Sequence, residues 1–126
     1  MSATITLNGK AYSWSGFNPR QMSTWKYTGS GTPVDFSYLT NRVSAATKGQ
    51  QSTVHWNLAV PRVATEATSC TCPGGLLGTD YVRIEVQAYP GSTTADRTDL
   101  AARIASLVGH ADFVASIVSL TQPTSV

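Results

Sequence analysis

The last third of the chain constrains the fold most, because a strand pattern there runs directly into a helical one. Apolar and polar residues alternate over Tyr81–Ala88, the period of a strand with one buried face. After Pro90-Gly91, apolar residues recur at helical spacing over Leu100–Val108. Thr93 is placed to cap this helix and Gly109 to end it. A sheet strand followed by a C-terminal helix is therefore predicted.

The chain before this strand consists of short alternating segments joined by polar turns. The strongest short-range signal is Asn8-Gly9 between Thr4–Leu7 and Lys10–Trp14, because Asn-Gly tolerates the positive φ angles of a tight hairpin turn. Further strands are predicted near Ser23–Tyr27, over Val34–Ser44 and over Thr53–Val60. The glycine-rich segment from Cys70 to Gly78 is expected to be an exposed loop.

Together these patterns predict an α+β fold in one domain over residues 1–126. It would comprise an N-terminal β-hairpin, an antiparallel sheet of about five strands and two C-terminal helices, the second over Ala111–Leu120. The Thr53–Val60 strand places Trp56 on an apolar face, and His55 and Asn57 on a polar one. Two short helices cannot cover the apolar face alone, so we expect a second chain to help cover it.

Composition narrows the classes of function. Charged residues make up 13% of the chain, about half of the roughly 25% typical of soluble domains. A net charge of +2 permits an anionic partner but lacks the basic signature of a strong, independent nucleic-acid binder. No apolar run approaches a membrane span and the N-terminus resembles no signal peptide, so we expect a cytosolic protein without a membrane partner.

Catalysis and metal binding are the less favoured readings. His55 and His110 are the only side chains suited to acid–base work near neutral pH, and no catalytic motif accompanies them, so no enzyme is predicted. Cys70 and Cys72 are too close for a disulfide framework within one chain, and a metal site would need two more ligands. We expect no cofactor or metal. These thiols are better placed to meet thiols of another chain after release from a reducing cytosol.

The polar sheet face is the main binding candidate. It mixes hydrogen-bonding groups, cations and one aromatic ring, a combination suited to unpaired RNA bases. Its predicted members are His55, Asn57, Tyr81 and Arg83, with Arg42 and Lys48 from the adjoining strand and turn. A plain solvated sheet face is the alternative reading.

Three segments give the sequence a family resemblance. They are Val60-Pro61-Arg62-Val63-Ala64-Thr65, Tyr81-x-Arg83-x-Glu85 and the paired helices from Asp96 to Leu120. With the intervening loop they resemble the coat proteins of single-stranded RNA bacteriophages, the leviviruses. The resemblance extends from about Thr53 to the C-terminus, and before that it depends on the hairpin and the strand order.

The resemblance implies a structural protein of the virion, assembled in the bacterial cytoplasm. Such subunits form a homodimer in which the helices of each chain clasp the partner's sheet, and dimers close into an icosahedral shell around the genomic RNA. The loop at Ser69–Thr79 would gather around the symmetry axes, where Cys70 and Cys72 would link subunits.

The resemblance also implies that the dimer binds an RNA stem-loop and represses replicase translation. Tyr81 falls where the family has its base-stacking tyrosine. Arg83 stands where asparagine is common, Asn57 where lysine is common and His55 where threonine is common. Thr40 and Arg42 are further RNA-binding candidates from the Val34–Ser44 strand. A small, free-standing dimeric RNA-binding β-domain is the alternative function.

Overall fold

The computed structural model describes residues 3–29, 31, 33–46, 49–64 and 75–124. The chain forms two compact units, Met1–Gln87 and Ala88–Val126, which we describe separately. Lys48, Cys70 and Cys72 lie outside the described residues.

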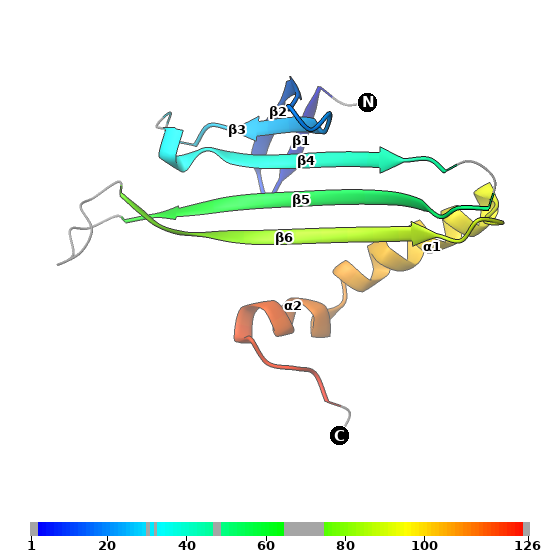
Figure 1. Ribbon diagram of the computed structural model, residues 1–126. Coiled ribbons are helices and arrows are strands. Elements are labelled where there is room, and N and C mark those ends of the chain that lie inside the picture. The colour runs from blue at the N-terminus through cyan, green and yellow to red at the C-terminus, as the bar shows by residue number, and fades with distance from the viewer. Residues whose placement is uncertain (1–2, 30, 32, 47–48, 65–74, 125–126) are drawn as a thin grey trace. The chain divides into compact units, whose positions relative to one another are not determined.

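The first unit is one six-stranded antiparallel sheet in which the strands lie in sequence order (Figure 1). The prediction of about five strands was one short, because the N-terminal hairpin continues the same sheet. The strands are β1 (Thr4–Leu7), β2 (Lys10–Phe17), β3 (Ser23–Tyr27), β4 (Ser37–Ser44), β5 (Ser52–Val63) and β6 (Leu76–Ala88).

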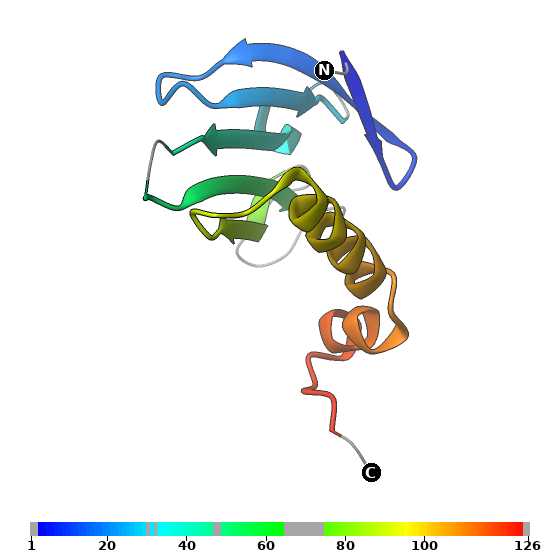
Figure 2. The same cartoon turned by 90° about the vertical axis from the view of Figure 1, so that its right-hand side faces the viewer.

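The turn between β1 and β2 confirms the Asn-Gly hairpin. Asn8 and Gly9 have φ angles of 50° and 74°, the positive values that a tight primed turn requires. β2 continues beyond the predicted Trp14 to Phe17, through an irregularity between Trp14 and Gly16. Gly16 adopts a φ of 94°, which a residue without Cβ reaches without strain. The hairpin turns out of the plane of the later strands (Figure 2).

β4 begins later than predicted. Residues 33–35 form a short 3₁₀ helix, η1 (Pro33–Asp35), and the strand starts only at Ser37. Pro33 has no backbone N–H for a sheet ladder, and its carbonyl instead accepts from the Phe36 backbone N–H at 3.2 Å. The strand prediction over Val34–Ser44 was therefore wrong in its first residues and right from Ser37 onward.

β5 and β6 are longer than predicted. The stretch from Leu76 to Thr79 was expected to be loop, but it belongs to β6. Bonding between the two strands extends to this end: the Ala64 backbone N–H donates to the Gly75 carbonyl at 2.8 Å. Nearby, Arg62 Nε lies 2.7 Å from Asp80 Oδ2. Pairing along the whole length of β5 overrides the weak strand propensity of Gly78.

The core of the sheet unit lies on one face, around Tyr12, Trp25 and Leu39, which are 1–7% exposed. Partly buried side chains pack against this cluster from β1, β3 and β5, namely Ile5, Leu7, Tyr27, Trp56 and Leu58. Trp25 stacks on Trp56 with ring centroids 5.8 Å apart. A buried hydroxyl pair ties the cluster to the backbone, because Ser37 Oγ lies 2.7 Å from the Tyr12 hydroxyl and donates to the Ala59 carbonyl.

The second unit comprises α1 (Thr94–Val108) and α2 (Ala111–Ser119). Thr93 caps α1 as predicted, in a reciprocal capping box with Asp96, and Gly109 ends it. α2 ends one residue before the predicted Leu120. No residue of either helix is buried. In the described chain no single helix is long and apolar enough to span a membrane. The pair α1 and α2, bent by 52°, is long and apolar enough when the two helices are taken together, by length and composition alone.

Candidate nucleic-acid interface

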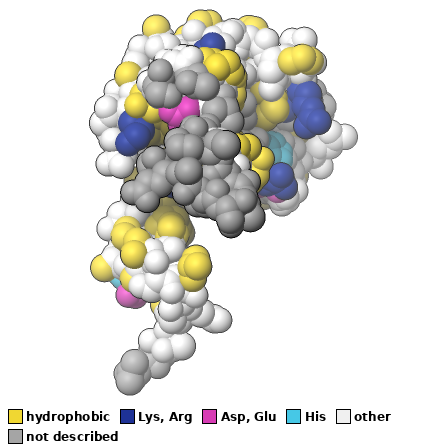
Figure 3. Space-filling model, turned by 90° about the vertical axis from the view of Figure 1, so that its left-hand side faces the viewer, with side chains coloured by type: hydrophobic (Ala, Val, Ile, Leu, Met, Phe, Trp, Pro, Cys, Tyr) yellow, Lys and Arg dark blue, Asp and Glu magenta, His cyan; other side chains and the backbone are white. Residues whose placement is uncertain are grey.

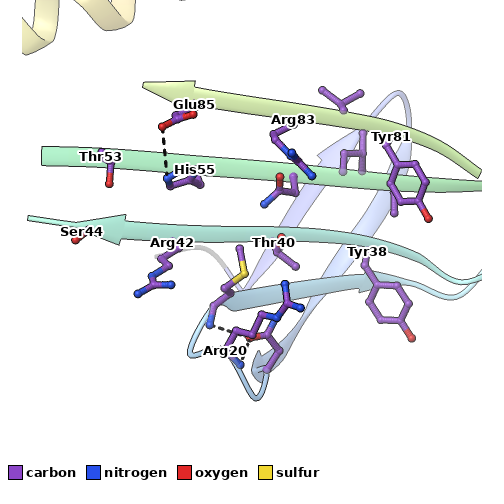
Figure 4. A pocket seen from close by; sticks show the side chains of 16 residues that line it. Arg20, Tyr38, Thr40, Arg42, Ser44, Thr53, His55, Tyr81, Arg83 and Glu85 are labelled. Atoms are coloured by element: carbon purple, nitrogen blue, oxygen red, sulfur yellow. Dashed lines mark hydrogen bonds and ion pairs between the residues drawn. The ribbon is translucent and has the colours of Figure 1, made fainter. Parts of the chain in front are cut away.

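The polar face of β4, β5 and β6 is hollowed into an open depression of about 780 Å³ (Figure 4). All of the predicted RNA-binding residues that the structure describes line it: Thr40, Arg42, His55, Asn57, Tyr81 and Arg83. Lys48, the seventh, lies outside the described residues.

The strand register brings these side chains together. On β4 and β5, Thr40 lies directly opposite Asn57, and Arg42 lies opposite His55. Because side chains alternate between the faces of a strand, both pairs project from the same face. Leu39, the residue before Thr40, points to the opposite face and into the core. Alternation in the sequence grouped His55 with Asn57, and the strand register adds Thr40 and Arg42 to the same face.

β6 adds a third row to this face. His55 Nε2 lies 4.0 Å from Glu85 Oε1, which aligns β5 with β6 at this point. Tyr81 and Arg83 precede Glu85 at intervals of two and line the same depression. The side chain of Tyr81 is 77% exposed, so its ring is accessible to a ligand.

Two further residues of this surface were not predicted. Tyr38 is 40% exposed and lies on β4, two residues before Thr40. Alternation along β4 places it on the same face as Thr40 and Arg42, so the sequence could have identified it. Arg20 reaches the depression from the loop between β2 and β3. No sequence pattern predicts that approach, because it depends on how the sheet curls.

The loop that presents Arg20 is tightly bonded. Asn18 Oδ1 accepts from the backbone N–H groups of Arg20 and Met22, at 2.9 and 3.0 Å. The Asn18 backbone N–H donates to the Met22 carbonyl at 3.0 Å. Gln21 completes the turn with a φ of 60°, in the left-handed region. These bonds fix the backbone on both sides of Arg20 beside the polar face.

The charges of the depression favour an anion. Its lining includes three arginines, Arg20, Arg42 and Arg83, against one carboxylate, Glu85. Guanidinium groups bind phosphate oxygens through paired N–H donors, while Asn57 and His55 supply neutral hydrogen-bonding groups. Lys and Arg side chains are spread over the sheet unit and form no dense block in the view of Figure 3. Such a surface combines moderate phosphate attraction with groups that can read bases.

His110, which the sequence offered as a candidate for acid–base chemistry, has a structural role. His110 caps α2, with Nδ1 accepting from the Asp112 backbone N–H at 3.1 Å. Within the part of the chain that the structure describes, no group of three or more His, Cys, Asp or Glu side chains could hold a metal ion.

Solved coat-protein structures share this fold over nearly the whole chain. The virus-like particle of Beihai levi-like virus 21 matches with a TM-score of 0.81 at 17% identity, covering 98% of both chains. The virus-like particle of bacteriophage ESE058 matches with a TM-score of 0.77 at 17% identity, covering 98% of this chain and 99% of the other. At these identities the likeness establishes the fold: a curled antiparallel sheet followed by two helices.

The sequence itself establishes the family. The family described as Levivirus coat protein matches residues 3–124, and the chain belongs to that family. It is therefore a viral coat protein, with a structural and not an enzymatic role, and its place is the virion. No curated protein matches the sequence. The resemblance seen in the sequence is thus confirmed at the level of family and fold.

Proposed function

We propose that this coat protein forms homodimers which assemble into an icosahedral shell around a single-stranded RNA genome. In this arrangement the helices of each chain interlock with the partner, and the polar face of β4–β6 meets the RNA. Dimers that bind an RNA stem-loop in the genome also repress replicase translation.

The apolar surface of the helical unit supports the need for a second chain. Apolar side chains on α1, on α2 and just after it are 42–89% exposed: Leu107, Val108, Val114, Ile117, Val118 and Leu120. Figure 3 shows such side chains at the surface of this unit. Covering one side chain of this size contributes about 1.5–3 kcal/mol. Contiguous exposed apolar surface on this scale marks an association site.

The polar face supports the RNA partner. A few arginines per chain would hold RNA weakly and in a salt-dependent way. Many copies fixed on one shell act at a high effective concentration, so a small cationic surface on each chain is sufficient. The exposed ring of Tyr81 offers a stacking surface for an unpaired base, as stem-loop recognition requires.

The decisive experiment is to express the full chain alone in bacteria and to examine the purified product. We expect closed particles by electron microscopy and nuclease-protected RNA inside them. Size-exclusion chromatography that shows only a small monomer would contradict the proposal. Free dimers that bind RNA without forming particles would favour the small RNA-binding β-domain instead.

Cys70 and Cys72 have a separate role in this proposal, as inter-subunit disulfides that form after release from the cell. Their single-residue spacing favours bonds between chains over a bond within one chain. We expect the Cys70→Ser, Cys72→Ser double variant to assemble normally and to disrupt at a lower temperature than the parent particle. Non-reducing gels should show covalent multimers of the parent only, and their absence would end the disulfide hypothesis.

A further inference from the structure

The polar face presents two exposed tyrosines where sequence reasoning identified one. Tyr38 on β4 and Tyr81 on β6 both line the depression, with 40% and 77% of their surfaces exposed. Figure 4 shows the two rings at the same end of the depression, with their hydroxyl groups pointing the same way. The strand between them is β5.

The residue between the two rings is small. Tyr38 lies directly opposite Ala59 on β5. β5 and β6 run in opposite directions (Figure 1), and His55 is aligned with Glu85 by their 4.0 Å contact. Counting four residues further along each strand brings Ala59 near Tyr81, and both line the depression. A methyl group on the middle strand leaves the space between the two aromatic side chains open.

The spacing suits nucleic-acid bases. Neighbouring strands lie about 4.8 Å apart, so β4 and β6 are separated by about 10 Å. Stacked bases lie about 3.4 Å apart along a strand, and a span of this size accommodates one base or two stacked bases. Aromatic rings bind unpaired bases by stacking, with little dependence on base identity. In a duplex the base faces are hidden, so such a slot selects single-stranded RNA.

We propose that Tyr38 and Tyr81 are the walls, and Ala59 the floor, of a slot that binds unpaired RNA bases, with Tyr38 as a second stacking platform. The inference rests on the proposed RNA-binding function of this face. Arg83, two residues from Tyr81, and Arg20, on the loop between β2 and β3, line the same depression and are placed to contact phosphates beside the slot.

The test uses the full-length protein as free dimers separated from assembled particles, because a closed shell would keep added probes from the polar face. The two fluorescein-labelled probes are a 12-nucleotide oligo(A) RNA and a 12-base-pair RNA duplex. Binding is measured by fluorescence anisotropy over a series of salt concentrations. Tyr38→Ala should weaken oligo(A) binding about 5- to 100-fold. The slope of log affinity against log salt should stay constant, because that slope counts phosphate contacts and not stacking. The loss should be confined to the single strand.

Matched variants separate stacking from general damage. Tyr38→Phe retains the ring and should restore binding, whereas Tyr38→Leu retains bulk without the ring and should bind as weakly as Tyr38→Ala. Tyr89→Ala removes an exposed tyrosine that does not line the depression, and should leave affinity unchanged. If both rings wall one slot, the combined loss in the Tyr38→Ala, Tyr81→Ala double variant should differ from the sum of the single losses.

The outcomes distinguish the slot from the proposed function on which it rests. If Tyr81→Ala weakens oligo(A) binding and neither Tyr38→Ala nor Tyr38→Leu does, the slot is refuted while RNA binding by this face stands. Equal losses on oligo(A) and duplex would also refute it. A parent protein that binds neither probe would overturn both.

Discussion

The sheet unit and the helical unit differ in how far they bury their apolar side chains. The sheet unit buries Trp25 to 1% exposure beneath its own strands, with Tyr12 and Leu39 beside it. The helical unit buries no residue, and Ile117 on α2 is 59% exposed. The sheet unit therefore contains its own hydrophobic core, while the helical unit leaves its apolar side chains exposed.

Helix physics explains the difference. α1 and α2 have 15 and 9 residues, lengths at which an isolated helix is marginal in water. Capping by Thr93 contributes about 1 kcal/mol, and His110 adds a single hydrogen bond at the start of α2, which together are not sufficient to hold such helices without packing. The apolar surface that would stabilise them is the surface a coat protein has available for association. The following predictions test this contrast.

The largest effect is expected at the core of the sheet unit. Trp25→Ala removes the most buried side chain and should lower the free energy of unfolding by about 3–5 kcal/mol. Urea denaturation followed by tryptophan fluorescence measures this loss. Phe17→Ala, at a position 68% exposed, is the control and should cost less than about 1 kcal/mol. Similar losses for both variants would mean that the sheet unit has no distinct core.

The next largest effect should appear only in the associated state. Ile117→Asp places a charge on the exposed apolar side of α2. In an isolated chain this change should have little effect on stability. In a covered interface it removes about 1.5–3 kcal/mol of favourable free energy from burial of the isoleucine, and desolvation of the new carboxylate weakens association further. Light scattering after size-exclusion chromatography should show smaller species. Gln122→Asp, beyond the end of α2, introduces the same charge as a control. Unchanged association of Ile117→Asp would show that α2 stays in water.

A smaller loss is expected in the loop that presents Arg20. Asn18→Ala removes the acceptor of two backbone N–H groups and should cost about 1–2 kcal/mol. Because Arg20 then loses its fixed position, the affinity for oligo(A) RNA should fall as well. Arg20→Ala, which removes the cation and keeps the loop, is the comparison for RNA binding. An Asn18→Ala protein with parental stability and RNA affinity would rule out this positioning role.

The smallest effect concerns the start of α1. The Thr93 backbone N–H donates to Asp96 Oδ2 at 3.1 Å, and this bond, with the Thr93 hydroxyl next, lowers the pKa of Asp96 below its usual 3.8. Because the folded-state pKa is the lower one, the stabilisation is complete above the unfolded-state value and is lost as pH falls through the folded-state pKa.

Circular dichroism at 222 nm, followed from about pH 6 down to about pH 2, measures this loss. The parent should lose helical signal in acid to a greater extent than Asp96→Asn, in which position 96 no longer titrates. Identical acid profiles for the two proteins would show that this carboxylate does not stabilise the helix.

Features that depend on neighbouring residues were predictable from the sequence. Asn8-Gly9 specifies its own turn, and Thr93 with Asp96 specifies the start of α1. The alternation along β5 and β6 grouped His55, Asn57, Tyr81 and Arg83 before any pairing was known, while Thr40 came from the family resemblance. Tyr38 lies on the same face of β4 as Thr40 but was not predicted as an interface residue. Its importance depends on the opposite residue being Ala59, which only the register reveals.

Features that depend on distant partners were not predictable. The extra residues of β6 exist because β5 is long enough to pair with them. Arg20 reaches the polar face because the β2–β3 loop lies beside β4 in the folded sheet. None of these relations has a local signal in the chain.

The amino-acid sequence by itself determined the class of this protein: the order of strands and helices, the division of each strand into an apolar and a polar side, and the coat-protein family. Periodicity and capping act between residues a few positions apart, so they can be read along the chain. The tertiary structure alone decided which residues of different strands stand opposite one another. Strand register placed Tyr38 opposite Ala59, and the sheet brought both to the same depression as Tyr81, because a sheet joins residues that are far apart in the sequence.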